Sequence, residues 1–150
     1  MSFTFTILAQ TRPKQRHRTN TKTGHTYTPK KTEVFEQIVR NEWERAGCIR
    51  LSDGPILLVV TAYFPRPKYH FNAKGELNKK GLEAIYPIVH PDWDNIGKIV
   101  SDALNKFAWH DDKQIAIAIT MKKWGDPKVV VHAREITARL NIGVSRAVGS

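Results

Sequence analysis

The sequence predicts a single compact domain of the α/β or α+β class, in which a mixed β-sheet packs against two main helices. Three observations predict this class. The chain has 150 residues without internal repeats, which is the usual length of one domain. Several short segments alternate apolar and polar residues or are continuously apolar, as strands are. Two longer segments carry apolar residues at helical spacing.

The first third of the chain predicts one strand, a basic excursion and one helix. Residues 2–9 alternate apolar and polar side chains, which indicates a strand. Residues 10–31 hold seven Lys or Arg, no acid, and many Thr, Asn, Gly and Pro, which favours a loop or hairpin. Residues 32–47 predict a helix that Thr32 caps and Gly47 ends. Its apolar face consists of Val34, Phe35, Ile38, Val39 and Trp43.

The rest of the sheet is expected from three later segments. Residues 55–64 are almost continuously apolar, which is typical of a central strand covered on both faces. Residues 65–91 predict a long irregular, basic loop, and a connection of this length tends to be functional or mobile. Residues 114–124 and 127–133 predict two more strands. The tail, residues 140–150, is expected to be flexible.

A second helix is predicted over residues 95–107. Its core face consists of Ile96, Ile99, Val100, Ala103, Leu104 and Phe107. Asp94 is the expected N-cap, and Asp92 is harder to explain structurally because a cap needs one carboxylate. Lys98 and Asp102 follow Asp94 at successive spacings of four residues, so the three side chains form one polar stripe. This stripe is either a surface ion-pair ladder or part of a site.

Residues 90–115 contain five aspartates, although the formal net charge of the chain is +10. Asp111 and Asp112 follow the helix, and the returning strand could bring them back beside it. Converging carboxylates repel each other unless a cation neutralises them, and carboxylate oxygens suit Mg²⁺ or Mn²⁺. No Cys/His spacing indicates zinc, so His90 and His110 are expected to be surface or hydrogen-bonding residues. A metal on acids, surrounded by basic loops, is typical of phosphodiester chemistry.

The surplus of Lys and Arg favours nucleic acid as the partner over a merely solvated surface. No apolar run reaches the roughly 18 residues of a membrane span, so no membrane partner is expected. The N-terminus lacks the features of a signal peptide, which favours the cytoplasm. Cys48 has no disulfide partner and is expected to be at least half-buried. The candidates for contact with the nucleic-acid backbone are Arg12, Lys14, Arg16, Arg18, Lys22, Lys30, Lys31, Arg66, Lys68, Lys79 and Lys80.

The string PDWDNIGKIVSDAL, followed by HDDKQI, resembles the RusA family of Holliday junction resolvases, which is common in bacteria and prophages. The family pattern is P-D-x-D-N-hydrophobic-x-K, then D-A-L on a helix, then D-D-x-Q before a strand. The order of the other elements also fits, so the resemblance covers most of residues 3–124. The matching positions are Asp92, Asp94, Asn95, Lys98, Asp102, Ala103, Leu104, Asp111, Asp112 and Gln114.

The resemblance implies a RusA-like, homodimeric endonuclease that cuts four-way DNA junctions symmetrically in recombination and repair. It implies Mg²⁺ as the cofactor, with Mn²⁺ as a possible substitute, and a bacterial or phage origin. The family's essential acids match Asp92, Asp94 and Asp112, and its supporting lysine matches Lys98. A dimer also suits the approximate twofold symmetry of a junction.

The remaining motif residues receive supporting roles from the same resemblance. Asp111 would be structural or lie behind the ligands, and Asn95 would support the site. Asp102 would orient Lys98 or pack on the helix surface. Trp93 is a departure, because the family more usually has an aliphatic residue there.

Two other functions stay open. The first is a nuclease selective for other branched DNA, such as flaps or forks, with the same need for the acids. The second is a non-catalytic basic module that binds nucleic acid and tolerates neutralisation of Asp92. The placement of Asp92, Asp94 and Lys98 argues against the module, because binding alone would be better served without the two acids.

Overall fold

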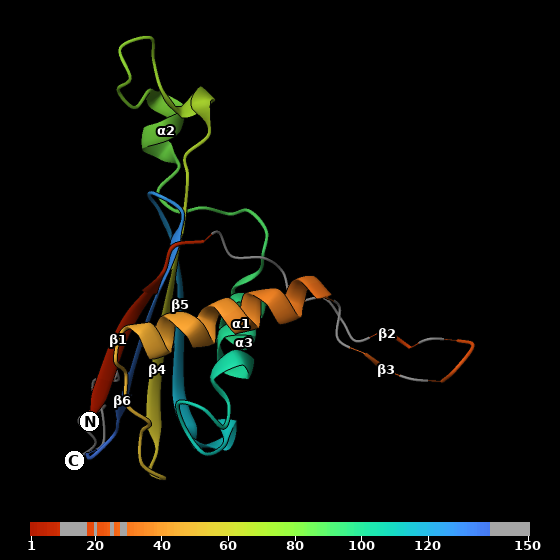
Figure 1. Ribbon diagram of the computed structural model, residues 1–150. Coiled ribbons are helices and arrows are strands. Elements are labelled where there is room, and N and C mark those ends of the chain that lie inside the picture. The colour runs from red at the N-terminus through yellow and green to blue at the C-terminus, as the bar shows by residue number, and fades with distance from the viewer. Residues whose placement is uncertain (10–17, 20, 25, 28–29, 139–150) are drawn as a thin grey trace, which may run out of the picture.

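A four-stranded mixed sheet in the order β1-β6-β4-β5 forms the framework of the protein, as predicted for the α+β class (Figure 1). Of the three neighbouring strand pairs in this sheet, β4–β5 is parallel and the other two are antiparallel. The computed structural model describes residues 1–9, 18–19, 21–24, 26–27 and 30–138. Its elements are β1 Ser2–Ile7, β2 Arg18–Thr19, β3 Thr26–Tyr27, α1 Lys30–Arg45, β4 Ile56–Phe64, η1 Lys68–His70, α2 Lys79–Glu83, α3 Trp93–Leu104, η2 Asp112–Gln114, β5 Ile115–Trp124 and β6 Lys128–Glu135.

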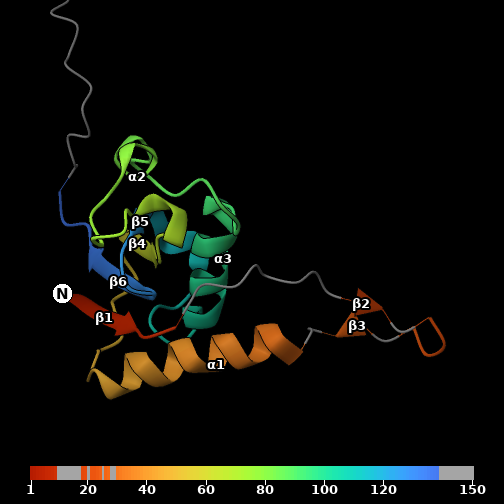
Figure 2. The ribbon, with the colours of Figure 1, turned by 90° about the horizontal axis from the view of Figure 1, so that it is seen from above.

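The helices α1 and α3 pack against each other and against the sheet, α1 on β1 and α3 on β4 and β5 (Figure 2). The core between these layers takes alternate residues of the strands, such as Phe3 and Phe5 of β1, because successive strand side chains point to opposite faces. The central strand β4 has seven buried positions, and Val59 and Tyr63 are half-buried. The prediction of a central strand is therefore confirmed.

The helix α3 buries the face that its spacing predicts, except at the C-terminal end. Ile96, Ile99 and Leu104 are all inaccessible to solvent. Phe107 was expected in the same face but is 44% exposed. The helix ends at Leu104 and Lys106 adopts a φ of 67°, which turns the chain away from the helical path. The aromatic ring of Phe107 instead lies 4.6 Å from the guanidinium of Arg40.

The helix α1 begins at Lys30, so Thr32 is a buried residue inside the helix and the predicted cap is wrong. The predicted apolar face is also too wide: Val34 and Ile38 are exposed, whereas Phe35 and Val39 are buried. Only a narrow stripe of this surface helix reaches the core.

The predicted end of α1 at Gly47 is confirmed. Gly47 has a φ of 67°, its N–H bonds to the carbonyl of Glu44, and the N–H of Cys48 bonds to that of Trp43. These bonds form a Schellman motif, in which glycine avoids the strain of a left-handed conformation. Cys48 is half-buried as expected, and burial raises the pKa of its thiol.

The excursion of residues 65–91 is more ordered than the predicted irregular loop, because it contains η1, α2 and a bridge between Phe71 and Leu77. The side chain of Asn78 caps α2 by accepting the N–H of Gly81 at 2.9 Å. The indole of Trp124 donates to the carbonyl of Ala84 at 2.7 Å. These bonds fix the excursion to the end of β5, beyond the sheet (Figure 1).

The basic segment before α1 contains the antiparallel pair β2–β3, so the described part of it is a hairpin. No helix among the described residues is long and apolar enough to cross a membrane. The predicted flexible tail, residues 140–150, lies outside the described residues.

Candidate functional site

The first turn of α3 presents two of the predicted acids to solvent. The helix begins at Trp93, so Asp92 is the N-cap and Asp94 lies in the first turn, which corrects the predicted capping role of Asp94. The Asp92 side chain makes no capping hydrogen bond, and its Oδ1 lies 3.3 Å from Nδ1 of His90. Within the described chain, the carboxylate of Asp94 has no hydrogen bond or ion pair. Capping therefore occupies neither carboxylate.

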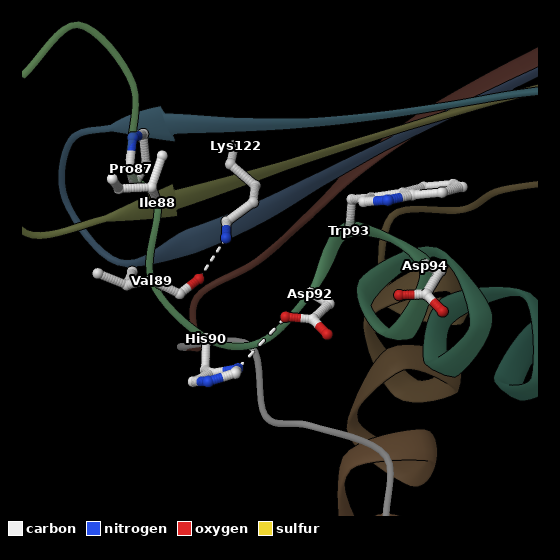
Figure 3. A pocket seen from close by; sticks show the side chains of 8 residues that line it. All are labelled: Pro87, Ile88, Val89, His90, Asp92, Trp93, Asp94 and Lys122. Atoms are coloured by element: carbon white, nitrogen blue, oxygen red, sulfur yellow. Dashed lines mark hydrogen bonds and ion pairs between the residues drawn. The ribbon is translucent and has the colours of Figure 1, made fainter.

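An open cavity of about 560 Å³, which we call the acid cavity, lies beside these two residues (Figure 3). One wall is the chain segment that leads into α3, and Lys122 of β5 forms another part of the lining. The Nζ of Lys122 donates to the carbonyl of Val89, which ties this segment to the sheet. The lining residues are Pro87, Ile88, Val89, His90, Asp92, Trp93, Asp94 and Lys122.

A second hollow of about 290 Å³, the helix–strand groove, runs between α3 and β5. Asp94 and Trp93 line both hollows, and Gly97 lines the groove. A Cβ at Gly97 would lie 2.8 Å from Oγ1 of Thr120, so glycine permits the close approach of helix and strand. The polar lining residues of the groove are Asp94, Lys98, Ser101, Asp112 and Thr120.

Asp112 reaches the groove from the turn between α3 and β5. Its Oδ1 accepts the indole N–H of the fully buried Trp109 at 2.7 Å. The backbone N–H of Asp112 donates to the side chain of Asn105 at 3.2 Å. The hydrogen bond from the buried Trp109 therefore orients the carboxylate of Asp112.

Asp111 serves the same turn in a different way. Its Oδ1 accepts the N–H of Lys113 at 2.8 Å, and Oε1 of Gln114 accepts the N–H of Asp111 at 3.0 Å, which completes a capping box. The amide of Gln114 also donates to the carbonyls of Ser52 and Gly54. Asp112 thus lines the groove, whereas Asp111 does not and stabilises the turn.

The supporting residues of the motif are placed less centrally. Lys98 is exposed and shares the groove with Asp94 and Asp112. Neither Asn95 nor Asp102 lines either hollow. The histidines behave as expected: His90 lies beside Asp92, and Nδ1 of His110 lies 3.3 Å from Arg50.

The predicted metal ligands do not meet at one point. Among the described residues, no three His, Cys, Asp or Glu side chains come together as a ready-made metal site. Asp94 shares the acid cavity with Asp92 and the groove with Asp112. The donors are nevertheless hard carboxylate oxygens, and those of Asp92 and Asp94 are exposed whereas Asp112 is half-buried. They fit Mg²⁺, which often keeps several waters and uses one or two carboxylates.

The predicted DNA contacts are spread over two separate regions. Lys68, Lys79 and Lys80 are exposed on the excursion, but Arg66 is half-buried and donates to the carbonyl of Gly81 at 2.7 Å. In the hairpin region and at the start of α1, the exposed lysines are Lys22, Lys30 and Lys31. Arg18 pairs through its backbone in β2. Arg12, Lys14 and Arg16 lie outside the described residues.

Trp93 and Lys122 are among the lining residues that the sequence did not mark as part of the site. Trp93 is 67% exposed and lines both hollows. Lys122 lines the acid cavity, and the alternation of the predicted strand could have found it, because Ala118 and Thr120 on the same side of β5 line the groove.

Comparison with known proteins gives two matches. The family model described as "Endodeoxyribonuclease RusA" matches residues 7–134. An uncharacterised protein of Bacillus subtilis (strain 168), YqaN, is 31% identical over 137 residues, which is 89% of this chain and 96% of the relative. The family match spans both hollows and all five aspartates of residues 90–115.

Proposed function

This chain belongs to the RusA endodeoxyribonuclease family, and we propose that it resolves four-way DNA junctions by paired, metal-dependent phosphodiester hydrolysis. One observation carries the proposal beyond the family match. Asp94 shares one hollow with Asp92 and the other with Lys98 and Asp112, so three acids and a cation line two hollows that have Asp94 in common. This is the set of groups that a phosphate and a divalent metal require.

Asp92, Asp94 and Asp112 would hold Mg²⁺, or Mn²⁺ in its place. When bound, such a cation polarises the phosphate and favours formation of hydroxide from water. Lys98 would donate to a non-bridging phosphate oxygen and offset the charge that develops there. Trp109 keeps Asp112 oriented toward the groove through its indole N–H.

The basic surplus would bind the DNA backbone around this site. The chain has 24 Lys and Arg against 14 Asp and Glu. Such contacts position the nucleic acid without reading bases, so branch selection would come from DNA shape. A homodimer would supply two sites for symmetric cuts. We infer a role in recombination and repair, in a bacterial or phage setting.

Cleavage of a labelled four-way junction in Mg²⁺, beside a linear duplex, tests the proposal. We expect paired nicks in the junction only. Asp94→Asn should lower the rate by more than the roughly 10- to 100-fold typical of a residue behind the ligands, with binding retained. Asp126→Asn is the matched control, because the exposed Asp126 lies in the turn between β5 and β6 and should leave the rate unchanged.

Three results would contradict the proposal in different ways. Tight binding without cleavage in Mg²⁺ or Mn²⁺ would indicate a binding module. Faster cleavage of flaps or forks than of four-way junctions would indicate a nuclease for other branched DNA. Full activity of Asp94→Asn would show that Asp94 is not an essential acid of the site.

A further inference from the structure

Trp93 is unusual among the four tryptophans of the chain because its indole is 67% exposed. Trp109 is fully buried, and Trp43 and Trp124 pack against the core. A single exposed apolar residue is common, but Trp93 lines the same cavity as the exposed Ile88 and Val89, and an exposed apolar patch at a functional site marks a place for a ligand. Trp93 lies between the two acids of the first turn of α3.

The ring of Trp93 is available for contact from outside. Within the described chain it makes no hydrogen bond, ring contact or cation–π contact. Figure 3 shows the indole beside Asp94 and turned away from Ile88 and Val89. The ring lines both hollows, so it borders the two hollows in which the acids lie.

The opposite wall of the acid cavity is also apolar and exposed. Ile88 is 96% exposed, Val89 is 47% exposed, and Pro87 completes the wall. Residues 81–91 contain no Lys or Arg, although the chain has 24. This surface therefore does not suit a phosphate backbone, yet it borders the acids that a phosphate would approach.

An unstacked nucleobase suits a surface that is apolar, carries no Lys or Arg, and borders the acids. Every base has a π-face that stacks on an aromatic side chain, and apolar side chains can insert at a disrupted base step. A continuous duplex keeps its bases stacked inside, whereas bases at a branch point can be unstacked. A base next to the cleaved phosphate would lie within reach of Trp93, because Asp92 and Asp94 flank this residue.

We propose that the exposed ring of Trp93, at the border of the acid cavity, is a stacking subsite for an unstacked nucleobase next to the cleaved phosphate. This subsite makes the enzyme prefer branched DNA to duplex. The inference rests on the proposed function and adds a specificity-determining residue to it. A second copy of the chain is a less suitable occupant, because it would cover the acids that the DNA must reach.

Binding to a four-way junction and to a duplex of the same sequence tests the subsite, with Ca²⁺ in place of Mg²⁺ to slow cleavage. Loss of one stack is worth about 1–3 kcal/mol, so Trp93→Leu should weaken junction binding about 5- to 150-fold and leave duplex binding unchanged. Trp93→Phe keeps a π-face and should be intermediate. Phe107→Leu is the matched control, since Phe107 is 44% exposed, lines neither hollow and is not among the predicted DNA contacts, so the substitution should change neither affinity.

Tryptophan fluorescence distinguishes stacking on a base from a purely structural role of Trp93, because a structural role would not change the emission when DNA is added. Stacking on a base should quench the emission of the exposed Trp93 when the junction is added, and Trp93→Phe should remove this quenching. Thermal unfolding of each variant should match the wild type, because the replaced ring is exposed. Equal loss of junction and duplex binding, unchanged junction binding, or conversion of a dimer into a monomer by Trp93→Leu would each overturn the subsite.

The subsite and the proposed function fail in different ways. A wild type that cleaves junctions, together with a Trp93→Leu variant that keeps the same preference, would reject the subsite alone. A wild type that neither cuts nor prefers junctions would reject both.

Discussion

At the scale of single residues, Asp112 takes its orientation from the core. Its carboxylate accepts a hydrogen bond from Trp109, whose indole is inaccessible to solvent. A buried donor fixes its acceptor more firmly than a surface partner does, because both the distance and the direction are set by packing. Trp109 is therefore a positioning residue for the groove.

Replacing Trp109 with Phe should lower both stability and cleavage. The loss of a hydrogen bond to a charged group destabilises by about 1–3 kcal/mol, and Asp112 loses its fixed orientation. Urea unfolding measures the first effect, and junction cleavage with Mg²⁺ measures the second.

Trp43→Phe provides the matched control, because Nε1 of Trp43 is buried and has no hydrogen-bond partner among the described residues. It should leave cleavage unchanged. If both variants lost cleavage in proportion to their stability, Trp109 would have no specific role in positioning Asp112.

At the scale of elements, the turn from α3 to β5 depends on Gln114. Its side chain accepts the backbone N–H groups of His110 and Asp111 and donates to two carbonyls of the loop before β4. One 9% exposed side chain thus joins the turn to a loop about 60 residues earlier in the chain. The position of Asp112 depends on this joint.

Gln114→Glu should destabilise the protein by about 2–4 kcal/mol at neutral pH. The shape is conserved, but both donated hydrogen bonds are lost and a carboxylate faces the carbonyls of Ser52 and Gly54. Chemical unfolding measures the difference. Gln37→Glu makes the same change on the exposed surface of α1 and should stay within about 0.5 kcal/mol of the wild type. Equal changes in the free energy of unfolding for the two substitutions would show that the hydrogen bonds of Gln114 do not stabilise the turn.

The elements themselves were largely predictable, and the errors have local causes. Helical spacing found both helices, but it does not reveal how wide a stripe the sheet covers, which is why Val34 and Ile38 were wrongly placed in the core. Phe107 continued the spacing of α3, yet the positive φ of Lys106 ends the pattern. Glycine is the residue that usually adopts a positive φ, and none stands at this turn, so the sequence does not predict the end of the helical pattern there.

The sequence predicts the acids of the candidate site through the resemblance to the RusA family, which selects Asp92, Asp94 and Asp112. The structure places these three side chains in the lining of the two hollows. The sequence predicts Asp94 as the N-cap of α3, whereas the N-cap is Asp92. The start of a helix is assigned from sequence only to within a residue or two. Alternation along β5 places Lys122 on the same side as Ala118 and Thr120, but that this side faces the first turn of α3 is a tertiary property.

At the scale of the molecule, the acids lie where α3 crosses the edge strand β5, and the two basic regions extend from the body in different directions (Figures 1 and 2). One chain offers one such set of acids. A four-way junction must be cut on two strands related by its symmetry, so paired cutting requires a second set held in a fixed relation to the first. Two copies of the 17.1 kDa chain would supply it.

Mixed dimers test this requirement directly. Wild-type and Asp94→Asn chains with different affinity tags, co-expressed and purified through both tags, should nick a junction on one strand only. Wild-type dimers should cut both strands, and Asp94→Asn dimers should cut neither, because each site would act on its own phosphate. Supercoiled cruciform plasmid distinguishes the outcomes, since one nick gives an open circle and paired cuts give a linear product. Paired cutting by the mixed species, or a solution mass of about 17.1 kDa for the active wild type, would contradict a homodimer with one site per chain.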